Sequence, residues 1–386
     1  MMPFVGRHRT ARTAYGFDDI ALAPGTSTVD PEDVDLSWRV GDLTFPLPFL
    51  GAAMDSVVDV RTAALLGALG AAGVLNLEGL QTRYPDPEVA LEAIASASPE
   101  EAVARLQEVY RPPVREELVA ERVAAIKAAG VPCLVSVTPA QAERLVRPAV
   151  EAGADAVLVQ STVVTERHRS RRGASLSLRD LTRRLDVPVM VGNCVTYDAA
   201  LQLLDAGAAG VFVGVGPGAA CTSRRVLGVG VPQATAIADV AAARDEYRRR
   251  TGVYVPVVAD GGIGVGGEVA KAIACGADAV MLGSALARAE EAPGRGFHWG
   301  MATPHAALPR GTRIRVGTSG TLRQILLGPA VVDDGSQNLA GALRTALGMC
   351  GATTLAEMHE VEIVLAPALA TEGKGLQFAQ RVGQGR

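Results

Sequence analysis

The sequence predicts an α/β protein whose parallel strands close into a (β/α)8 barrel within a single domain. Three observations carry this prediction. Short apolar runs recur along the chain, amphipathic stretches separate them, and glycine-rich segments follow several of the runs instead of the first alone. About eight strand-helix units fit between residues 45 and 305, close to the roughly 250 residues of a TIM barrel. The G-x-G-x-x-G turn of an open dinucleotide-binding sheet is missing near the start.

Seven of the strands are predicted individually, because buried parallel strands read as continuous apolar runs. Four runs follow a segment that ends in Ala-Gly or Cys-Gly, where we expect the glycine to cap a helix in the left-handed conformation. Three runs follow a Val-Pro connection. The first group comprises residues 72–75, 152–159, 206–213 and 275–282, and the second comprises residues 131–135, 187–191 and 255–259.

The segments around these strands divide the chain further. Helices are expected at residues 197–206, 233–250 and 268–274. We expect an irregular cap segment over one mouth at residues 1–45, the catalytic barrel with no inserted regulatory domain at 46–355, and a C-terminal extension at 356–386. Residues 338–351 are predicted as one more helix and residues 366–386 as a mobile tail.

Composition excludes several classes of protein. Of the 386 residues, 48% are hydrophobic and 20% charged, which excludes a disordered chain. The net charge of −4 gives no general attraction to nucleic acid or anionic membranes. No apolar run is long enough to span a membrane, and the start lacks the apolar stretch of a secretory signal, so we expect a cytoplasmic protein. The five cysteines form no C-x-x-C pair, which argues against disulfides and a zinc site.

Two glycine-rich loops are predicted to bind phosphate. In a barrel of this kind the loops after the last two strands favour phosphate. Residues 260–264, Asp-Gly-Gly-Ile-Gly, follow one late strand, and Gly283 and Ser284 follow the next. Exposed backbone N–H groups could cradle the phosphate while Asp260 accepts hydrogen bonds from ribose hydroxyls. The alternative is that both loops are only tight turns.

Cys221 is predicted to be a nucleophile. It follows three alternating glycines in residues 214–223, whereas the other four cysteines lie in strand-like or helix-like contexts that indicate core positions. Arg224 and Arg225 come shortly after it, and their charge would favour a thiolate. The alternative is a buried cysteine that acts as a small hydrophobe.

The run from Gly216 to Gln233 resembles the catalytic loop of the IMP dehydrogenase and GMP reductase family. The resemblance covers roughly residues 14–355 and is greatest to the branch that lacks the paired regulatory domains, because only a short helical stretch separates Leu77 from Val131. Further matches in the family's order are residues 17–19, 53–55, 192–193, 259–263, 281–284, 291–294 and 300–301.

The resemblance implies NAD-dependent oxidation of IMP to XMP in guanine nucleotide biosynthesis, with Cys221 forming a covalent adduct at purine C2. It also implies a homotetramer. An NADPH-dependent GMP reductase and a non-catalytic or weakly active nucleotide-binding paralogue remain alternatives. By resemblance, the nucleotide would be bound by Met54, Asp260, Gly261, Gly262, Gly283, Ser284, Gly300, Met301 and Arg310, the cofactor by Gln160, Ser161, Asn193, Gly214 and Gly216, and a potassium ion by the carbonyls of Gly216, Gly218 and Cys221.

Several residues depart from the family's pattern. Ala52 and Ala219 replace serines, Phe212 replaces an arginine, Gln160 replaces an aspartate, and Arg310 stands where an acid or amide is expected. Only eight residues lie between Met301 and Arg310, so the family's mobile flap with its water-activating arginine and tyrosine is missing. The candidate replacements for the water-activating pair are Ser223, His298 and His305.

The basic run at residues 167–172 allows two interpretations. It is either a solvated loop or a clamp for cofactor phosphates. For a clamp, neutralising Arg169 and Arg171 should raise the KM for the cofactor more than that for the nucleotide. Nucleic-acid binding is not favoured, because no aromatic residues accompany the charge.

Overall fold

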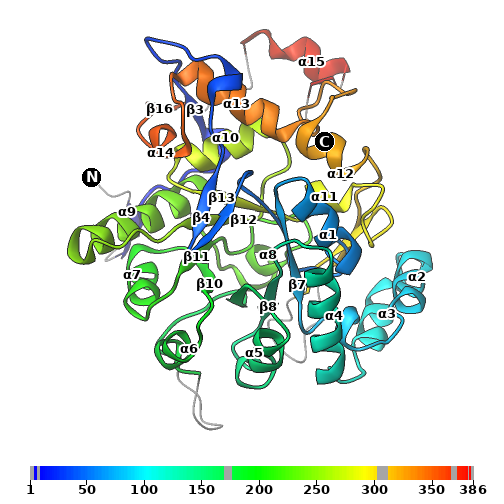
Figure 1. The fold of residues 1–386 in the computed structure, drawn as a ribbon. Coiled ribbons are helices and arrows are strands. Elements are labelled where there is room, and N and C mark those ends of the chain that lie inside the picture. Colours follow the sequence, from blue (N-terminus) through cyan, green and yellow to red (C-terminus); the bar gives the residue numbers. More distant parts are fainter. Residues whose placement is uncertain are drawn as a thin grey trace.

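The computed structural model describes residues 4–6, 9–168, 176–301, 312–366, 372–380 and 382–383. Eight parallel strands close into a barrel in which each strand pairs with its neighbours in the chain, and helices surround it (Figure 1). The predicted (β/α)8 TIM barrel is therefore confirmed. No helix in these residues is long and apolar enough to cross a membrane. The barrel strands are β6 (Phe49–Gly51), β7 (Ala72–Asn76), β8 (Leu134–Val137), β9 (Ala156–Gln160), β10 (Val189–Cys194), β11 (Gly210–Val213), β12 (Val257–Asp260) and β13 (Ala279–Leu282).

Each of the seven predicted runs overlaps a barrel strand, and the sequence pattern does not single out the eighth, β6. Its three residues lack the preceding Ala-Gly or Val-Pro signal. Gly153, Gly207 and Gly276 have φ values of 103°, 92° and 107°, as predicted for left-handed helix ends. The same prediction for Gly73 is wrong, because this residue lies within β7 and Gly70 takes the left-handed conformation.

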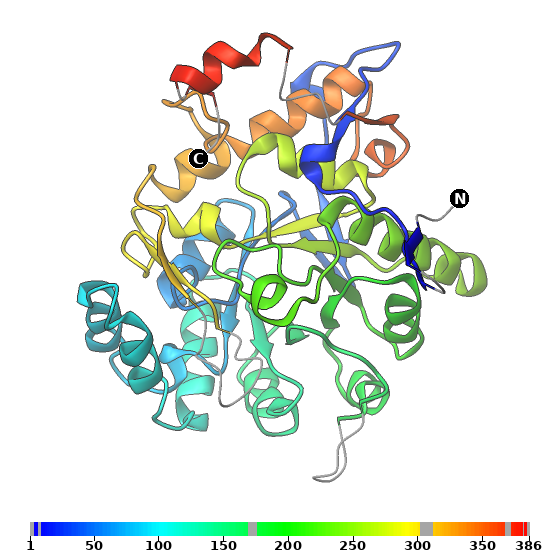
Figure 2. The ribbon, with the colours of Figure 1, turned by 180° about the vertical axis from the view of Figure 1, so that it is seen from behind.

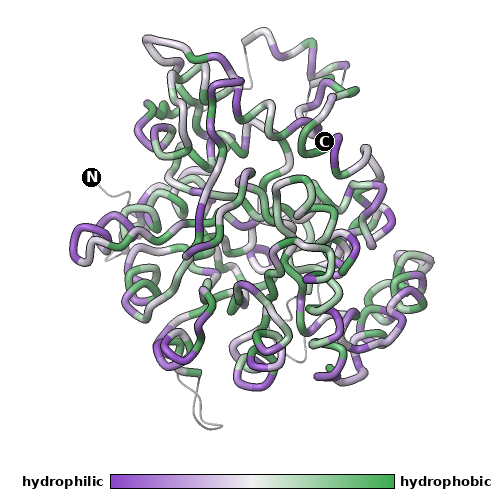
Figure 3. Tube along the Cα trace, in the orientation of Figure 1, coloured by the Kyte–Doolittle hydropathy of each residue, from purple (hydrophilic) through white to green (hydrophobic). Residues whose placement is uncertain are grey.

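The predicted helices are present as α7 (Tyr197–Asp205), α9 (Gln233–Thr251), α10 (Gly266–Ala274) and α13 (Leu339–Cys350). The apolar faces of α7, α9 and α10 pack on the strands in one large core, and α13 packs on α10. The outer turns of the surrounding helices are hydrophilic (Figure 3). Further helices around the barrel are α1 (Val60–Ala68), α4 (Glu116–Ala128), α5 (Ala142–Glu151), α6 (Leu178–Arg184), α8 (Ser223–Leu227) and α11 (Ser284–Ala287).

The segment before the barrel is more regular than predicted. It contains a hairpin of β4 (Trp38–Val40) and β5 (Leu43–Phe45), in which the rings of Trp38 and Phe45 stack 5.1 Å apart. The hairpin turn at Gly41 contacts Pro188, which directly precedes β10, so the hairpin lies at the amino ends of the barrel strands. The expected tail also contains a short helix, α15 (Gly375–Gln380).

A helical insertion, residues 79–114, separates β7 from α4. It carries α2 (Glu88–Ser96) and α3 (Ala102–Val109), which project from the side of the barrel in both ribbon views (Figures 1 and 2). The insertion forms a second, smaller core with β14 (Phe297–Trp299), a strand paired with β15 (Arg313–Arg315). Its apolar members include Leu80, Leu91, Ile94, Leu106, Tyr110 and Trp299.

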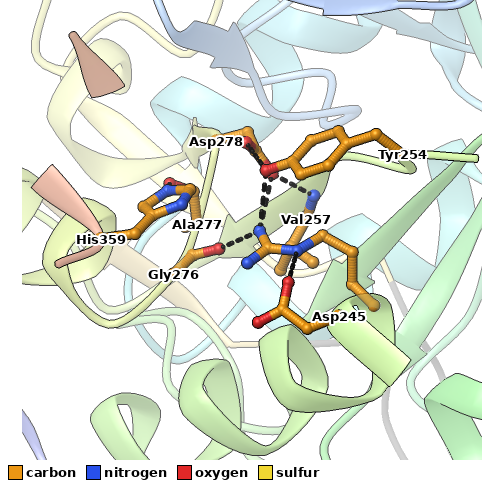
Figure 4. Close-up of polar contacts among 8 residues, drawn as sticks. Asp245, Tyr254, Val257, Gly276, Ala277, Asp278 and His359 are labelled. Atoms are coloured by element: carbon orange, nitrogen blue, oxygen red, sulfur yellow. Dashed lines mark hydrogen bonds and ion pairs between the residues drawn. The ribbon is translucent and has the colours of Figure 1, made fainter. Parts of the chain in front are cut away.

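A buried ion pair stabilises the amino-terminal side of the barrel (Figure 4). Arg244 of α9 is 3% exposed, and it donates to the carbonyl of Gly276 over 2.8 Å and to Asp278 over 3.3 Å. Asp278 also accepts hydrogen bonds from the Tyr254 hydroxyl and the Val257 amide. The network joins α9 to the starts of β12 and β13. It lies away from the carboxyl ends of the strands, where a site is expected.

Candidate active site

A cavity of about 730 Å³ lies at the carboxyl ends of the barrel strands. Part of its wall is α8, which lies in front of the middle of the barrel in Figure 2. The structure brings together in its wall all the predicted site residues that it describes. Arg310 and His305 lie outside the described residues, as do Arg169 and Arg171, and Arg167 and His168 are exposed. The predicted residues in the wall are Met54, Gln160, Ser161, Asn193, Gly214, Gly216, Gly218, Cys221, Ser223, Asp260, Gly261, Gly262, Gly283, Ser284, Gly300 and Met301.

Asp260 is held at the end of β12 by two amide side chains. Asn193 Nδ2 and Gln160 Nε2 donate to Asp260 Oδ2 over 2.7 and 2.9 Å, and Asn193 also donates to the carbonyl of Gly214. Burial raises the pKa of Asp260 to about 6, although these two hydrogen bonds act in the opposite direction. The carboxylate is therefore held in place, and its burial makes the charged form unfavourable when no ligand is bound.

The loop that carries Cys221 depends on glycines because other segments approach it closely. Gly216 has a φ of 76°, and a Cβ there would lie 2.5 Å from Arg224 Cγ. The Arg224 guanidinium donates to the carbonyls of Val215 and Val231 over 3.1 and 2.8 Å, so it joins the two limbs of the loop. Burial lowers the pKa of Arg224, and the nearby Cys221 acts in the opposite direction.

Cys221 differs from the other cysteines in exposure. Its side chain is exposed, and its Sγ donates to the Oγ of Ser223 over 3.4 Å. Ser223 itself is 3% exposed. Burial raises the pKa of the thiols of Cys133, Cys194 and Cys275 to about 12, so these three are poor nucleophiles. The exposed thiol in the cavity wall is the one suited to covalent chemistry.

The first predicted phosphate loop, residues 260–264, packs against the Cys221 loop. Gly261 and Gly262 have φ values of 82° and 74°. A Cβ on Gly261 would lie 3.3 Å from the Gly218 amide nitrogen, and one on Gly262 would lie 3.0 Å from Pro217 Cβ. Glycine is needed at both positions for conformation and for space. The Cys221 loop and the loop at residues 260–264 therefore form one continuous part of the cavity wall.

His298, one of the candidates for activating water, lies beside Gly283. A Cβ on Gly283 would be 3.2 Å from His298 Nε2, while the other ring nitrogen, Nδ1, is 2.8 Å from Ser56 Oγ. The ring is 3% exposed and lines the cavity, and burial lowers the pKa of His298 to about 4. The imidazole is neutral at physiological pH. If Ser56 donates to Nδ1, Nε2 carries a proton and offers a donor near the phosphate loop.

Sequence reasoning missed residues on two sides of the site. Gln233 is 4% exposed and donates to the carbonyls of Val213 and Asp260, which joins the ends of β11 and β12. Polar residues at the ends of β7 and β8, and in the segments after these strands, complete the cavity wall. Their signal was polar side chains directly after predicted strands, the same signal that identified Asp260. These missed residues are Asn76, Glu78, Arg83, Ser136 and Thr138.

Comparison with known proteins identifies the family of this chain. The family model described as IMP dehydrogenase / GMP reductase domain matches residues 14–373. The chain is 40% identical over 370 residues to a protein of Mycolicibacterium smegmatis described as an uncharacterized oxidoreductase, covering 94% of this chain and 99% of that protein. It is 28% identical to the inosine-5'-monophosphate dehydrogenase of Methanocaldococcus jannaschii, covering 91% and 92%.

A solved structure has the same architecture. The crystal structure of an IMP dehydrogenase/GMP reductase-like protein from Corynebacterium glutamicum is 37% identical and superimposes with a TM-score of 0.88, covering 94% of this chain and 96% of that one. The resemblance seen in the sequence motifs is thereby confirmed, and the chain belongs to the IMP dehydrogenase / GMP reductase family of oxidoreductases.

Proposed function

We propose that this oxidoreductase converts IMP to XMP with NAD as the hydride acceptor, a step of guanine nucleotide biosynthesis. The observation that carries the proposal is the position of Cys221, an exposed thiol in the same cavity wall as Asp260 and Gly283. Nucleotide binding alone requires no nucleophile at this place. The similarity to the Methanocaldococcus jannaschii dehydrogenase supports the same reaction.

The reaction proceeds through a bond between Cys221 and the purine. Cys221 Sγ attacks C2, and hydride leaves from that carbon. Water then adds to the thioimidate, the C–S bond breaks, and XMP and the thiol are released. The proposed role of the Ser223 hydroxyl, which accepts the thiol's hydrogen bond, is to relay the thiol's proton by donating its own hydrogen to water in the cavity.

The remaining predicted residues bind and orient the nucleotide. The Asp260 carboxylate accepts hydrogen bonds from the ribose hydroxyls, and the amides of Gly262, Gly283 and Ser284 donate to the phosphate. Gly300 and Met301 contact the purine. We assign His298 to the phosphate end because its Nε2 lies beside Gly283, so its proposed role is in binding instead of water activation.

The cavity also suits the proposed cofactor and cation. Ser136, Thr138 and Ser161 line it at the ends of β8 and β9, three and two strands away from β11, and their hydroxyls match the ribose and phosphate oxygens of NAD. Bound NAD supplies the hydride acceptor. The Gly218 carbonyl accepts the Cys221 N–H over 3.0 Å and keeps a second lone pair for potassium. Oxygen ligands of this kind are those that a hard cation prefers.

An absorbance assay of reduced nicotinamide tests the proposal. IMP with NAD should give a rise that needs potassium and that Cys221→Ala abolishes. A fall with GMP and NADPH would establish the reductase instead. No absorbance change in either assay, with IMP still bound, would establish a binding paralogue.

We also propose that the protein is a cytoplasmic homotetramer. Light scattering that shows only monomer would contradict this proposal.

A further inference from the structure

One hydroxyl of the helical insertion joins the two segments that flank the purine end of the cavity. The Tyr110 hydroxyl donates to Asp55 Oδ2 over 2.6 Å and accepts the indole N–H of Trp299 over 2.9 Å. Met301 Sδ lies 3.2 Å from the same oxygen. Met301 and Met54, the neighbour of Asp55, both line the cavity, whereas Tyr110 does not. Tyr110 therefore contacts the site from behind.

These groups are buried together. Tyr110 is 6% exposed, and Asp55 and Trp299 are each 1% exposed. The Leu80 amide, from the start of the insertion, donates to the same carboxylate oxygen over 2.9 Å, and a Cβ on Gly79 would lie 2.2 Å from its other oxygen. A buried carboxylate needs such partners, because an unsatisfied one is strongly unfavourable. The Met54–Asp55 turn thus depends on the insertion.

The insertion also binds the hairpin of β14 and β15. Arg313 of β15 donates to the carbonyl of Ala97 over 2.7 Å at the end of α2, and its guanidinium lies 4.4 Å from the ring centroid of Phe297. Arg295, just before β14, pairs with Glu88 over 2.5 Å. Because β14 leads directly into Gly300 and Met301, contacts that hold this hairpin also set the position of those two residues.

We propose that Tyr110 is a positioning residue for nucleotide recognition. Through its hydroxyl, the helical insertion holds Met301 and the Met54–Asp55 turn in the geometry that binds the purine. The identity of the nucleotide rests on the proposed function above, but the positioning does not. Tyr110 touches no substrate, so its loss should weaken nucleotide binding and leave the chemical step at Cys221 intact.

The first test compares Tyr110→Phe with a matched control, Tyr84→Phe. Tyr84 belongs to the same insertion, and its hydroxyl donates to the Val109 carbonyl over 2.9 Å, which is a bond within the insertion itself. Tyr110→Phe should raise the KM and the calorimetric Kd for IMP about tenfold, the scale of one lost hydrogen bond, with kcat changed less than about twofold. Tyr84→Phe should leave both constants unchanged. Equal effects of the two variants would overturn the proposal.

A double-mutant cycle tests whether the effect passes through Met301. In a Met301→Leu background, Tyr110→Phe should raise the Kd for IMP clearly less than in wild type, because only the effect through the Met54–Asp55 turn remains. An undiminished effect in this background would show that Tyr110 does not act through Met301.

Hydrogen exchange at residues 297–301 provides a readout without any substrate. Tyr110→Phe should accelerate exchange there, and Tyr84→Phe should not; equal exchange in both variants contradicts the proposal. If exchange responds as expected but IMP is neither bound nor oxidised, the proposed function fails alone. Should Tyr110→Phe not fold, Trp299→Phe removes the indole donor and leaves the bond between Tyr110 and Asp55. It tests the link to β14 alone and should accelerate exchange at residues 297–301.

Discussion

Asn193 Nδ2 lies 2.7 Å from Asp260 Oδ2, and this contact joins the ends of β10 and β12 across the strand between them. Gln160, from β9, donates to the same oxygen. Three strand ends therefore hold one carboxylate in place before a nucleotide arrives. Such preorganisation lowers the cost of ordering the site on binding.

The first prediction concerns the charge of Asp260. Its pKa of about 6 is above the ordinary 3.8, so the folded protein loses stability from this group as the pH rises through 6. Asp260→Asn has no charge to bury and keeps an oxygen for Asn193 and Gln160. Its free energy of unfolding, relative to wild type, should therefore increase between pH 5 and pH 8, while its affinity for IMP falls at least tenfold.

Urea unfolding at the two pH values, together with calorimetric titration of IMP, checks this prediction. A difference in unfolding free energy that is the same at pH 5 and pH 8 would show that Asp260 carries no raised pKa.

The second prediction concerns thiol reactivity. Iodoacetamide at pH 8 should modify Cys221 first, because it is exposed whereas burial raises the pKa of Cys133, Cys194 and Cys275 to about 12. IMP should protect Cys221. Peptide mass spectrometry over time measures both effects, and Cys194→Ala should leave the modification rate of Cys221 unchanged. Faster labelling of any buried cysteine would contradict the assignment.

The third prediction compares two histidines. His298→Ala removes a ring from the wall beside Gly283 and should raise the KM for IMP about tenfold, with little effect on the KM for NAD. His359 bonds the Ala277 carbonyl over 3.0 Å near the buried ion pair, as Figure 4 shows, so His359→Ala should leave both constants unchanged. Steady-state kinetics measure these constants. If His298→Ala raises the KM for NAD more than the KM for IMP, His298 belongs to the cofactor site instead.

The fourth prediction concerns the ion pair of Arg244 and Asp278 (Figure 4). Asp278→Ala leaves the buried guanidinium without its buried carboxylate partner and should cost about 3–5 kcal/mol of unfolding free energy. Asp245, the other carboxylate on Arg244, has a side chain that is 49% exposed, and Asp245→Ala should cost less than about 1 kcal/mol.

Denaturant unfolding of the two variants tests this difference. Because the pair lies at the starts of β12 and β13, both variants should keep the wild-type KM values in their folded fraction. A changed KM for IMP would mean that the amino-terminal network is coupled to the opposite mouth.

The barrel was predictable because its strands are buried on both faces, which demands continuous apolar runs that stand out in the sequence. The three-residue strand β6 was not, since so short a run carries no pattern. The misassigned cap at Gly73 has a steric cause. A Cβ there would lie 2.8 Å from Ala63 Cα in α1, so this glycine serves packing and not helix termination.

The sequence by itself determined the (β/α)8 barrel, the glycine-rich loops and the family, because these depend on local runs and on motifs of fixed spacing. Only the tertiary structure decided which polar groups meet. Tyr110 is 55 positions from Asp55 and 189 from Trp299, yet one hydroxyl joins them. Barrel closure brings strand ends together whatever their separation in the chain, and no local pattern records which side chains then lie within hydrogen-bonding distance.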